Sequence, residues 1–238
     1  KDTLEWGKWN ADGSFTAGES YDLTKSQTYN GYYAQGKLSL SHNGNRILIG
    51  GNKYTGTYGR IYVLDYNDET AEWGRFYPDG TFKKYDHRED FTTAYVMDVH
   101  GSYLYGHYSS MSDDGNTIVS GRHIDTNSGY THVWKYNPET YEWGKWNADG
   151  SFTPLTETSN GRYDARTTNA YWDLYRSSAV CYYGMVTHLS SDGKTLLSGG
   201  YHNSSRGRAY IWQYDEVTAE WGKFNPDGSF VKPTSNTD

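Results

Sequence analysis

The segment Glu-Trp-Gly-Lys-Trp-Asn-Ala-Asp-Gly-Ser-Phe at residues 5–15 decides the fold, because closely similar segments begin at Glu72, Glu142 and Glu220. The copies follow one another at intervals of about 70 residues, and self-similarity at a regular period is typical of repeat architectures. In each copy an Asp-Gly pair precedes Ser or Thr and Phe. Such a pair predicts a tight turn.

Two further blocks lie at fixed positions before the last three copies. The first reads Ser-His-Asn-Gly-Asn-Arg-Ile-Leu-Ile-Gly at residues 41–50 and returns in related form at 112–121 and 190–199. The second ends in Tyr66, Tyr136 or Tyr214. Asn-Gly or Asp-Gly before a short apolar run is typical of β-hairpins, and these runs are too short for helices. Each repeat is predicted to hold four strands: before the turn, after it, around Val63, Val133 or Ile211, and at Glu-Trp-Gly.

These blocks predict an all-β fold that forms a single repeat domain over residues 1–238. It would contain three four-stranded antiparallel repeats of about 70 residues and one surplus terminal strand. The predicted boundaries are a fourth strand at 5–15, repeats at 16–82, 83–152 and 153–230, and a tail at 231–238.

Composition narrows the class of protein. The chain has 25 Tyr and 9 Trp, which favours a folded β protein with a core built from these rings. A net charge of -7 without a run of Lys or Arg argues against nucleic acid as a partner. The sequence predicts no membrane-spanning helix. A single cysteine, Cys181, excludes an internal disulfide, and Asn203 begins an N-glycosylation sequence.

The blocks at 112–121 and 129–136 resemble the repeats of WD40-type and integrin-like FG-GAP β-propellers, and the Glu-Trp-Gly segment resembles the WG repeat, a short β-hairpin unit. The resemblance covers the second half of each repeat and implies propeller-like blades. The Trp-Asp dipeptide of WD40 repeats is missing, since Trp134 precedes Lys135. The spaced acidic loop that holds calcium in FG-GAP blades is also missing, so we expect no cofactor and keep calcium only as an alternative without a full ligand loop.

Three blades are fewer than the four to eight that usually close a propeller. Either three thick sheets close around a threefold axis within one chain, or the surplus strand pairs with another chain. Unpaired strand edges favour the second arrangement. The expected partner is then the protein itself or another repeat protein, bound through edge strands.

The repeats differ in length in one segment, at residues 16–43, 83–114 and 153–192, and these inserts are rich in Tyr. Aromatic rings beside polar groups suit a saccharide or a protein surface, although the same rings could cover the sheets. The candidate ligand-binding residues, including some in the neighbouring loops, are Tyr29, Tyr32, Tyr54, Tyr85, His87, Arg88, His123, Tyr163, Arg166, Trp172, Tyr201 and His202. The tryptophans that recur in every copy are predicted to pack between blades: Trp6, Trp73, Trp143 and Trp221.

No metal-binding His pattern, nucleophile elbow or phosphate loop occurs, so we predict no catalytic residue and no metal site. The leading hypothesis is a non-enzymatic structural or interaction protein, extracellular or at the cell surface. It would self-associate or dock through strand pairing and bind through its Tyr-rich inter-blade loops. The alternative is a carbohydrate-binding lectin with one site per repeat. A glycosidase-like enzyme ranks third, because carboxylates are plentiful.

Overall fold

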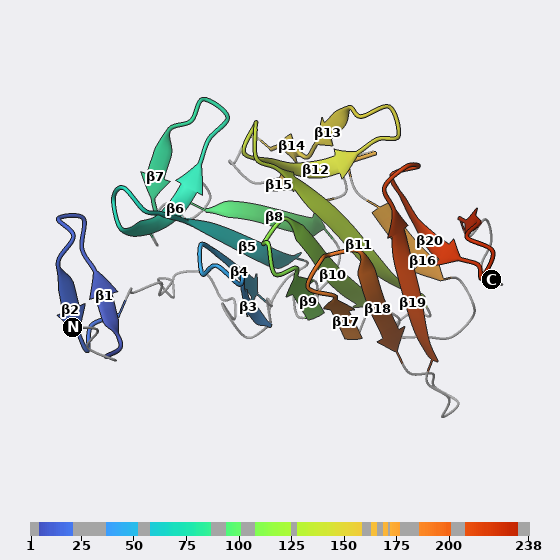
Figure 1. Ribbon diagram of the computed structural model, residues 1–238, viewed down its shortest axis with the longest axis horizontal. Coiled ribbons are helices and arrows are strands. Elements are labelled where there is room, and N and C mark those ends of the chain that lie inside the picture. Colours follow the sequence, from blue (N-terminus) through green and yellow to red (C-terminus); the bar gives the residue numbers. More distant parts are fainter. Residues whose placement is uncertain are drawn as a thin grey trace.

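The computed structural model places strands in one small sheet and three large ones, and no helix occurs in the part of the chain that it describes (Figure 1). The all-β class predicted from the sequence is confirmed. The described residues are 5–20, 37–51, 58–86, 94–100, 108–124, 128–158, 163–165, 169–170, 172–176, 186–200 and 208–232.

The three large sheets repeat one order of antiparallel strands. The first sheet runs β3 (Leu38–Leu40), β4 (Arg46–Gly51), β5 (Tyr58–Asn67), β6 (Glu72–Phe76) and β7 (Phe82–Lys84). The second runs β9 (Tyr108–Met111), β10 (Thr117–Ile124), β11 (Ser128–Asn137), β12 (Glu142–Trp146) and β13 (Phe152–Pro154). The third runs β17 (Val186–Leu189), β18 (Thr195–Gly200), β19 (Arg208–Asp215), β20 (Glu220–Phe224) and β21 (Phe230–Val231).

The Glu-Trp-Gly segment is a hairpin, whereas we predicted a single strand. In the second sheet its two strands, β12 and β13, are joined by a turn in which the Asp149 carboxylate accepts hydrogen bonds from the Ser151 N–H and hydroxyl, at 2.9 and 2.6 Å. Gly144 lets the strands approach closely, because a Cβ there would lie 2.1 Å from the Thr153 carbonyl oxygen. The first copy forms the same hairpin from β1 (Gly7–Trp9) and β2 (Phe15–Ala17).

Each later insert sends a strand back to the sheet that precedes it. β8 (Tyr95–His100) pairs with β5, and β16 (Trp172–Arg176) pairs with β11. The third insert reaches further, because it contains β14 (Thr156–Glu157) and β15 (Tyr163–Asp164), and β15 runs parallel to β8 of the first sheet. The strands of one sheet therefore cross the repeat boundaries expected from the sequence.

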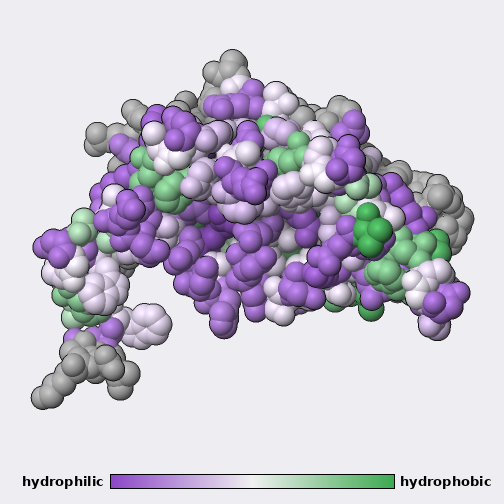
Figure 2. All heavy atoms as spheres, turned by 45° about the horizontal axis from the view of Figure 1, so that its top comes forward, coloured by the Kyte–Doolittle hydropathy of each residue, from purple (hydrophilic) through white to green (hydrophobic). Residues whose placement is uncertain are grey.

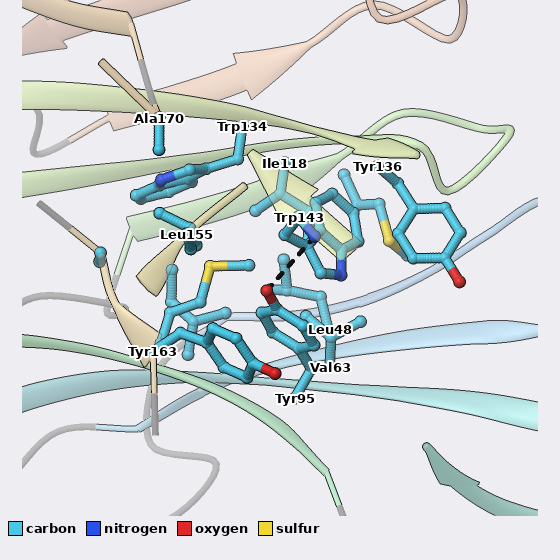
Figure 3. Packing of buried hydrophobic residues seen from close by; sticks show 14 residues of the cluster. Leu48, Val63, Tyr95, Ile118, Trp134, Tyr136, Trp143, Leu155, Tyr163 and Ala170 are labelled. Carbon is cyan, nitrogen blue, oxygen red and sulfur yellow. Dashed lines mark hydrogen bonds between the residues drawn. The ribbon is translucent and has the colours of Figure 1, made fainter. Parts of the chain in front are cut away.

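The sheets pack in succession through opposite faces, because neighbouring residues of a strand point to opposite sides. Leu48 and Val63 of the first sheet pack against Ile118, Trp134 and Trp143 of the second, where the Trp143 N–H donates to the Tyr95 hydroxyl at 3.3 Å (Figure 3). On its other face the second sheet meets the third through a further cluster, which includes Val119, Val133, Leu196, Trp212 and Trp221.

The three sheets form an open row along the described residues. Every extensive contact between strands of different large sheets joins the first to the second or the second to the third. A matching ladder links their Asn-Gly and Asp-Gly turns: the His42 N–H donates to the Asp113 carbonyl at 2.7 Å, and the Asp113 N–H donates to the Ser191 carbonyl at 2.9 Å. The alternative of three sheets closing around a threefold axis is not what the described strands form.

Candidate functional site

The outer face of the third sheet carries exposed apolar side chains. Leu197 and Ile211 lie opposite each other on β18 and β19, and 38% and 69% of their surfaces are exposed. Their counterparts in the first two sheets, Leu48 with Val63 and Val119 with Val133, are at most 2% exposed. Val186 on β17 is exposed beside them. We call Val186, Leu197 and Ile211 the open face. Exposed apolar patches are common at the sites where proteins bind partners.

The hairpin β1–β2 is a second element without a neighbouring strand among the described residues. It forms a two-stranded sheet of its own and lies beyond the first sheet in Figure 1. Its three counterparts each pair with the end of a long strand, where the motif Trp packs against a Tyr, as Trp143 does against Tyr136 with ring centroids 5.2 Å apart. Trp6 is 94% exposed, whereas Trp73, Trp143 and Trp221 are at most 9% exposed. Only the first of the four copies leaves its Trp in water.

Two grooves lie at equivalent places between successive sheets. The first has a volume of 320 Å³ and the second 440 Å³. Both are bordered by the turn residues Asp114 and Asn116, by the ring of Tyr136 and by the last aromatic residue of a Glu-Trp-Gly strand, which is Phe76 in the first groove and Trp146 in the second. Rings beside hydrogen-bonding groups form a surface suited to a small polar ligand.

A cation covers the motif tyrosine in both grooves. The Arg46 guanidinium carbon lies 3.7 Å from the Tyr136 ring centroid, and the Lys135 ammonium lies 4.3 Å from that of Tyr214. Lys135 occupies the position that Asp65 has in the first sheet, so the two cations come from different strands. Burial lowers the pKa of Lys135 and raises the pKa values of Tyr136 and Tyr214. Each groove therefore has a cation against its motif tyrosine, but the cation comes from a different strand position in the two grooves.

The described candidate residues of the inserts lie in the core. Trp172 is buried, and its indole N–H donates to the Ala219 carbonyl at 2.8 Å. Tyr163 stacks on Tyr95 with centroids 4.0 Å apart, accepts a hydrogen bond from Arg75, and has its pKa raised to about 12 by burial. Tyr85 is also buried. In this structure all three complete the packing of the sheets, so their rings are closed to a ligand from solvent.

Of the other sequence candidates, His123 alone lies within the described residues. His123 is placed by its backbone alone, in β10. The residues that lie outside the described ranges are Tyr29, Tyr32, Tyr54, His87, Arg88, Arg166, Tyr201, His202 and Asn203.

Sequence reasoning missed the open face and the groove cations. Aligning the repeats would have shown that Leu197 and Ile211 occupy the positions of Val119 and Val133. Their exposure depends on a following sheet, which the alignment alone does not reveal. The cations were hidden because they exchange strands between grooves.

The groups needed for a metal site or a membrane span are not found in the described ranges. They contain no cluster of three or more His, Cys, Asp and Glu side chains suited to a metal ion. They also contain no helix with the length and apolar character needed to span a bilayer. Figure 2 shows a mostly hydrophilic face on which apolar residues gather in small separate groups.

Comparison with known proteins finds a distant likeness to a solved structure. No protein-family model and no curated protein matches the chain. A solved structure of a mutant prolyl oligopeptidase B from Galerina marginata, bound to a 35mer hydrolysis and macrocyclization substrate, is similar over 81% of this chain, with 12% identity and a TM-score of 0.42. The match spans 22% of that protein. A likeness this distant transfers neither activity nor substrate.

Proposed function

We propose that this protein is a non-enzymatic scaffold of propeller-like blades, extracellular or at the cell surface, that associates with a second copy or another repeat protein through strand pairing. The observation that carries the proposal is the separate hairpin β1–β2. Its three counterparts pair with a third strand and bury their Trp, whereas this one forms its own sheet and exposes Trp6. A hairpin whose three counterparts each pair with a long strand is suited to dock on a strand of this kind in another chain.

The exposed rings of the hairpin provide the test. A chain carrying Trp6→Ser and Trp9→Ser is compared with wild type by native mass spectrometry and sedimentation at micromolar concentration. Because both rings are largely exposed, the change should leave the fold intact, which circular dichroism checks. Association of the wild type that weakens at least tenfold in the variant supports strand pairing through the hairpin. Unchanged association rejects it.

Saccharide binding is the second candidate, favoured by the recurrence of the groove at both sheet boundaries. Trp146 borders the second groove, and Trp9 holds the same motif position in the separate hairpin, away from both grooves. A glycan array probed with wild type, Trp146→Ala and Trp9→Ala chains distinguishes a groove site from non-specific binding through exposed aromatic rings. Sugar binding lost only with Trp146→Ala supports a lectin. A blank wild-type array, or loss with both variants, rejects a groove site.

A further inference from the structure

The contact between successive sheets follows one plan at both internal boundaries. One sheet presents the face that holds Leu48 and Val63, or their counterparts Val119 and Val133, and the next sheet covers it. The turns keep the same register, since each donates a backbone hydrogen bond to the turn of the following sheet. A surface complementary to this face is therefore already present in the molecule.

The third sheet presents the same face, and no other large sheet of the described residues covers it. Leu197 and Ile211 stand where Val119 and Val133 stand, yet they are exposed. The turn repeats the pattern: the described residues offer no acceptor to the Ser191 N–H, although the equivalent groups of His42 and Asp113 each have one.

At its turn and at Ile47 the first sheet lacks the opposite half of the same contact, whereas Ile49, Tyr62 and Leu64 on that side are at most 3% exposed. A Cβ on Gly115 would lie 3.2 Å from Ser41 Cβ, and one on Gly193 would lie 2.7 Å from Thr117 Oγ1, both in the preceding turn. A Cβ on Gly44 would have no atom within 4 Å. Ile47 is also half-buried, whereas its counterparts Ile118 and Leu196 are fully buried. The space that a preceding turn fills elsewhere is open here.

From these two ends we infer that two copies associate head to tail, with the open face of one packed on the first sheet of the other. The occupant is a second copy because the covering surface known to fit this face is a sheet of the same repeat. Two copies supply six large sheets, within the four to eight blades of closed propellers. Two equivalent contacts then close a ring. The inference rests on the proposed function and identifies its partner.

The central test places a charge in the open face. Ile211→Glu adds a carboxylate that the contact would bury without a partner, whereas Val217→Glu, at an 83% exposed turn residue outside the open face, is the control. Native mass spectrometry and sedimentation of full chains should show twice the mass of one chain for wild type and for Val217→Glu. Ile211→Glu should weaken association about 100-fold. Circular dichroism verifies that each variant is folded.

Five results distinguish this inference from the proposed function when the Trp6→Ser, Trp9→Ser chain is measured alongside. Loss of association in both variants supports both. Loss only in the hairpin variant supports strand pairing and overturns the head-to-tail contact. Loss only with Ile211→Glu supports the contact and overturns pairing through the hairpin. A monomeric wild type overturns the inference, and a series of masses beyond two chains overturns the closed ring.

Discussion

The guanidinium carbon of Arg46 lies 3.7 Å from the centroid of the Tyr136 ring and thereby joins the first sheet to the second. The nitrogens of the Arg46 guanidinium group form an ion pair with Asp65 at 2.5 Å and donate hydrogen bonds to the Gly115 carbonyl and the Asn116 side chain, each at 3.0 Å. Arg46→Ala leaves the Asp65 carboxylate and two acceptors without their donor. We expect a loss of about 2–3 kcal/mol in the free energy of unfolding, measured by urea denaturation.

Lys194→Ala is the control for Arg46, because the Lys194–Glu216 pair is formed at 2.8 Å by two exposed side chains. Water and salt screen such a pair, so its removal should leave the urea midpoint almost unchanged. Equal losses in the two variants would contradict a special role for Arg46 between the sheets.

Trp143 and Trp6 hold the same motif position in opposite surroundings. Trp143→Ala removes a ring buried between two sheets and should lower the unfolding free energy by about 3–5 kcal/mol. Trp6→Ala removes an exposed ring and should leave thermal unfolding of a dilute, unassociated chain unchanged. A destabilised Trp6→Ala chain at that dilution would show that the hairpin packs on its own chain.

Gly144 should tolerate no side chain. Its Cβ would meet the Thr153 carbonyl oxygen at 2.1 Å, so Gly144→Ala must separate β12 from β13 and should cost about 1–3 kcal/mol in chemical denaturation. Gly7→Ala makes the equivalent clash, at 2.3 Å, in the separate hairpin. That control should leave the main unfolding transition in place, and a shift there would contradict the hairpin's independence.

Alkaline pH should unfold the protein through its buried tyrosines. Burial raises the pKa of Tyr214 above the ordinary value of 10.0, and that of Tyr163 to about 12. The folded state therefore holds these protons after the unfolded state has released them. The stabilisation that these two protonated tyrosines contribute is complete below pH 10 and is lost as the pH rises above it. Tyr214→Phe should raise the midpoint pH of alkaline unfolding, followed by circular dichroism.

The control for Tyr214 is Tyr66→Phe, at the half-buried equivalent position in the first sheet. It should move the alkaline midpoint less than Tyr214→Phe does. A larger shift of the midpoint from Tyr66→Phe than from Tyr214→Phe would contradict the prediction that Tyr214 governs alkaline unfolding.

Local chemistry predicted the strands around each Asp-Gly turn, because the turn dipeptide and the apolar run lie within ten residues of each other. It did not predict β8 and β16. Their sequences, beginning at Tyr95 and Trp172, share no motif, and they become strands by pairing with β5 and β11. Strand formation of this kind depends on the tertiary neighbour more than on intrinsic preference.

The candidate site shows the same limit. Trp172 and Tyr163 were assigned to a ligand because they lie in variable inserts, but an aromatic residue there can equally complete a sheet. Leu197 and Ile211 read as core residues from their alternation. Whether such a face is covered depends on another sheet, so the sequence of the strand cannot show it.

The parallel pairing of β15 with β8 has a consequence for synthesis. Chains emerge from the ribosome starting at the N-terminus, and early segments commonly begin to fold first. Here the strand Tyr163–Asp164 adds to a sheet that begins at Leu38. That edge of the nascent first sheet therefore stays unfinished until strands β9 to β13 of the second sheet have been translated.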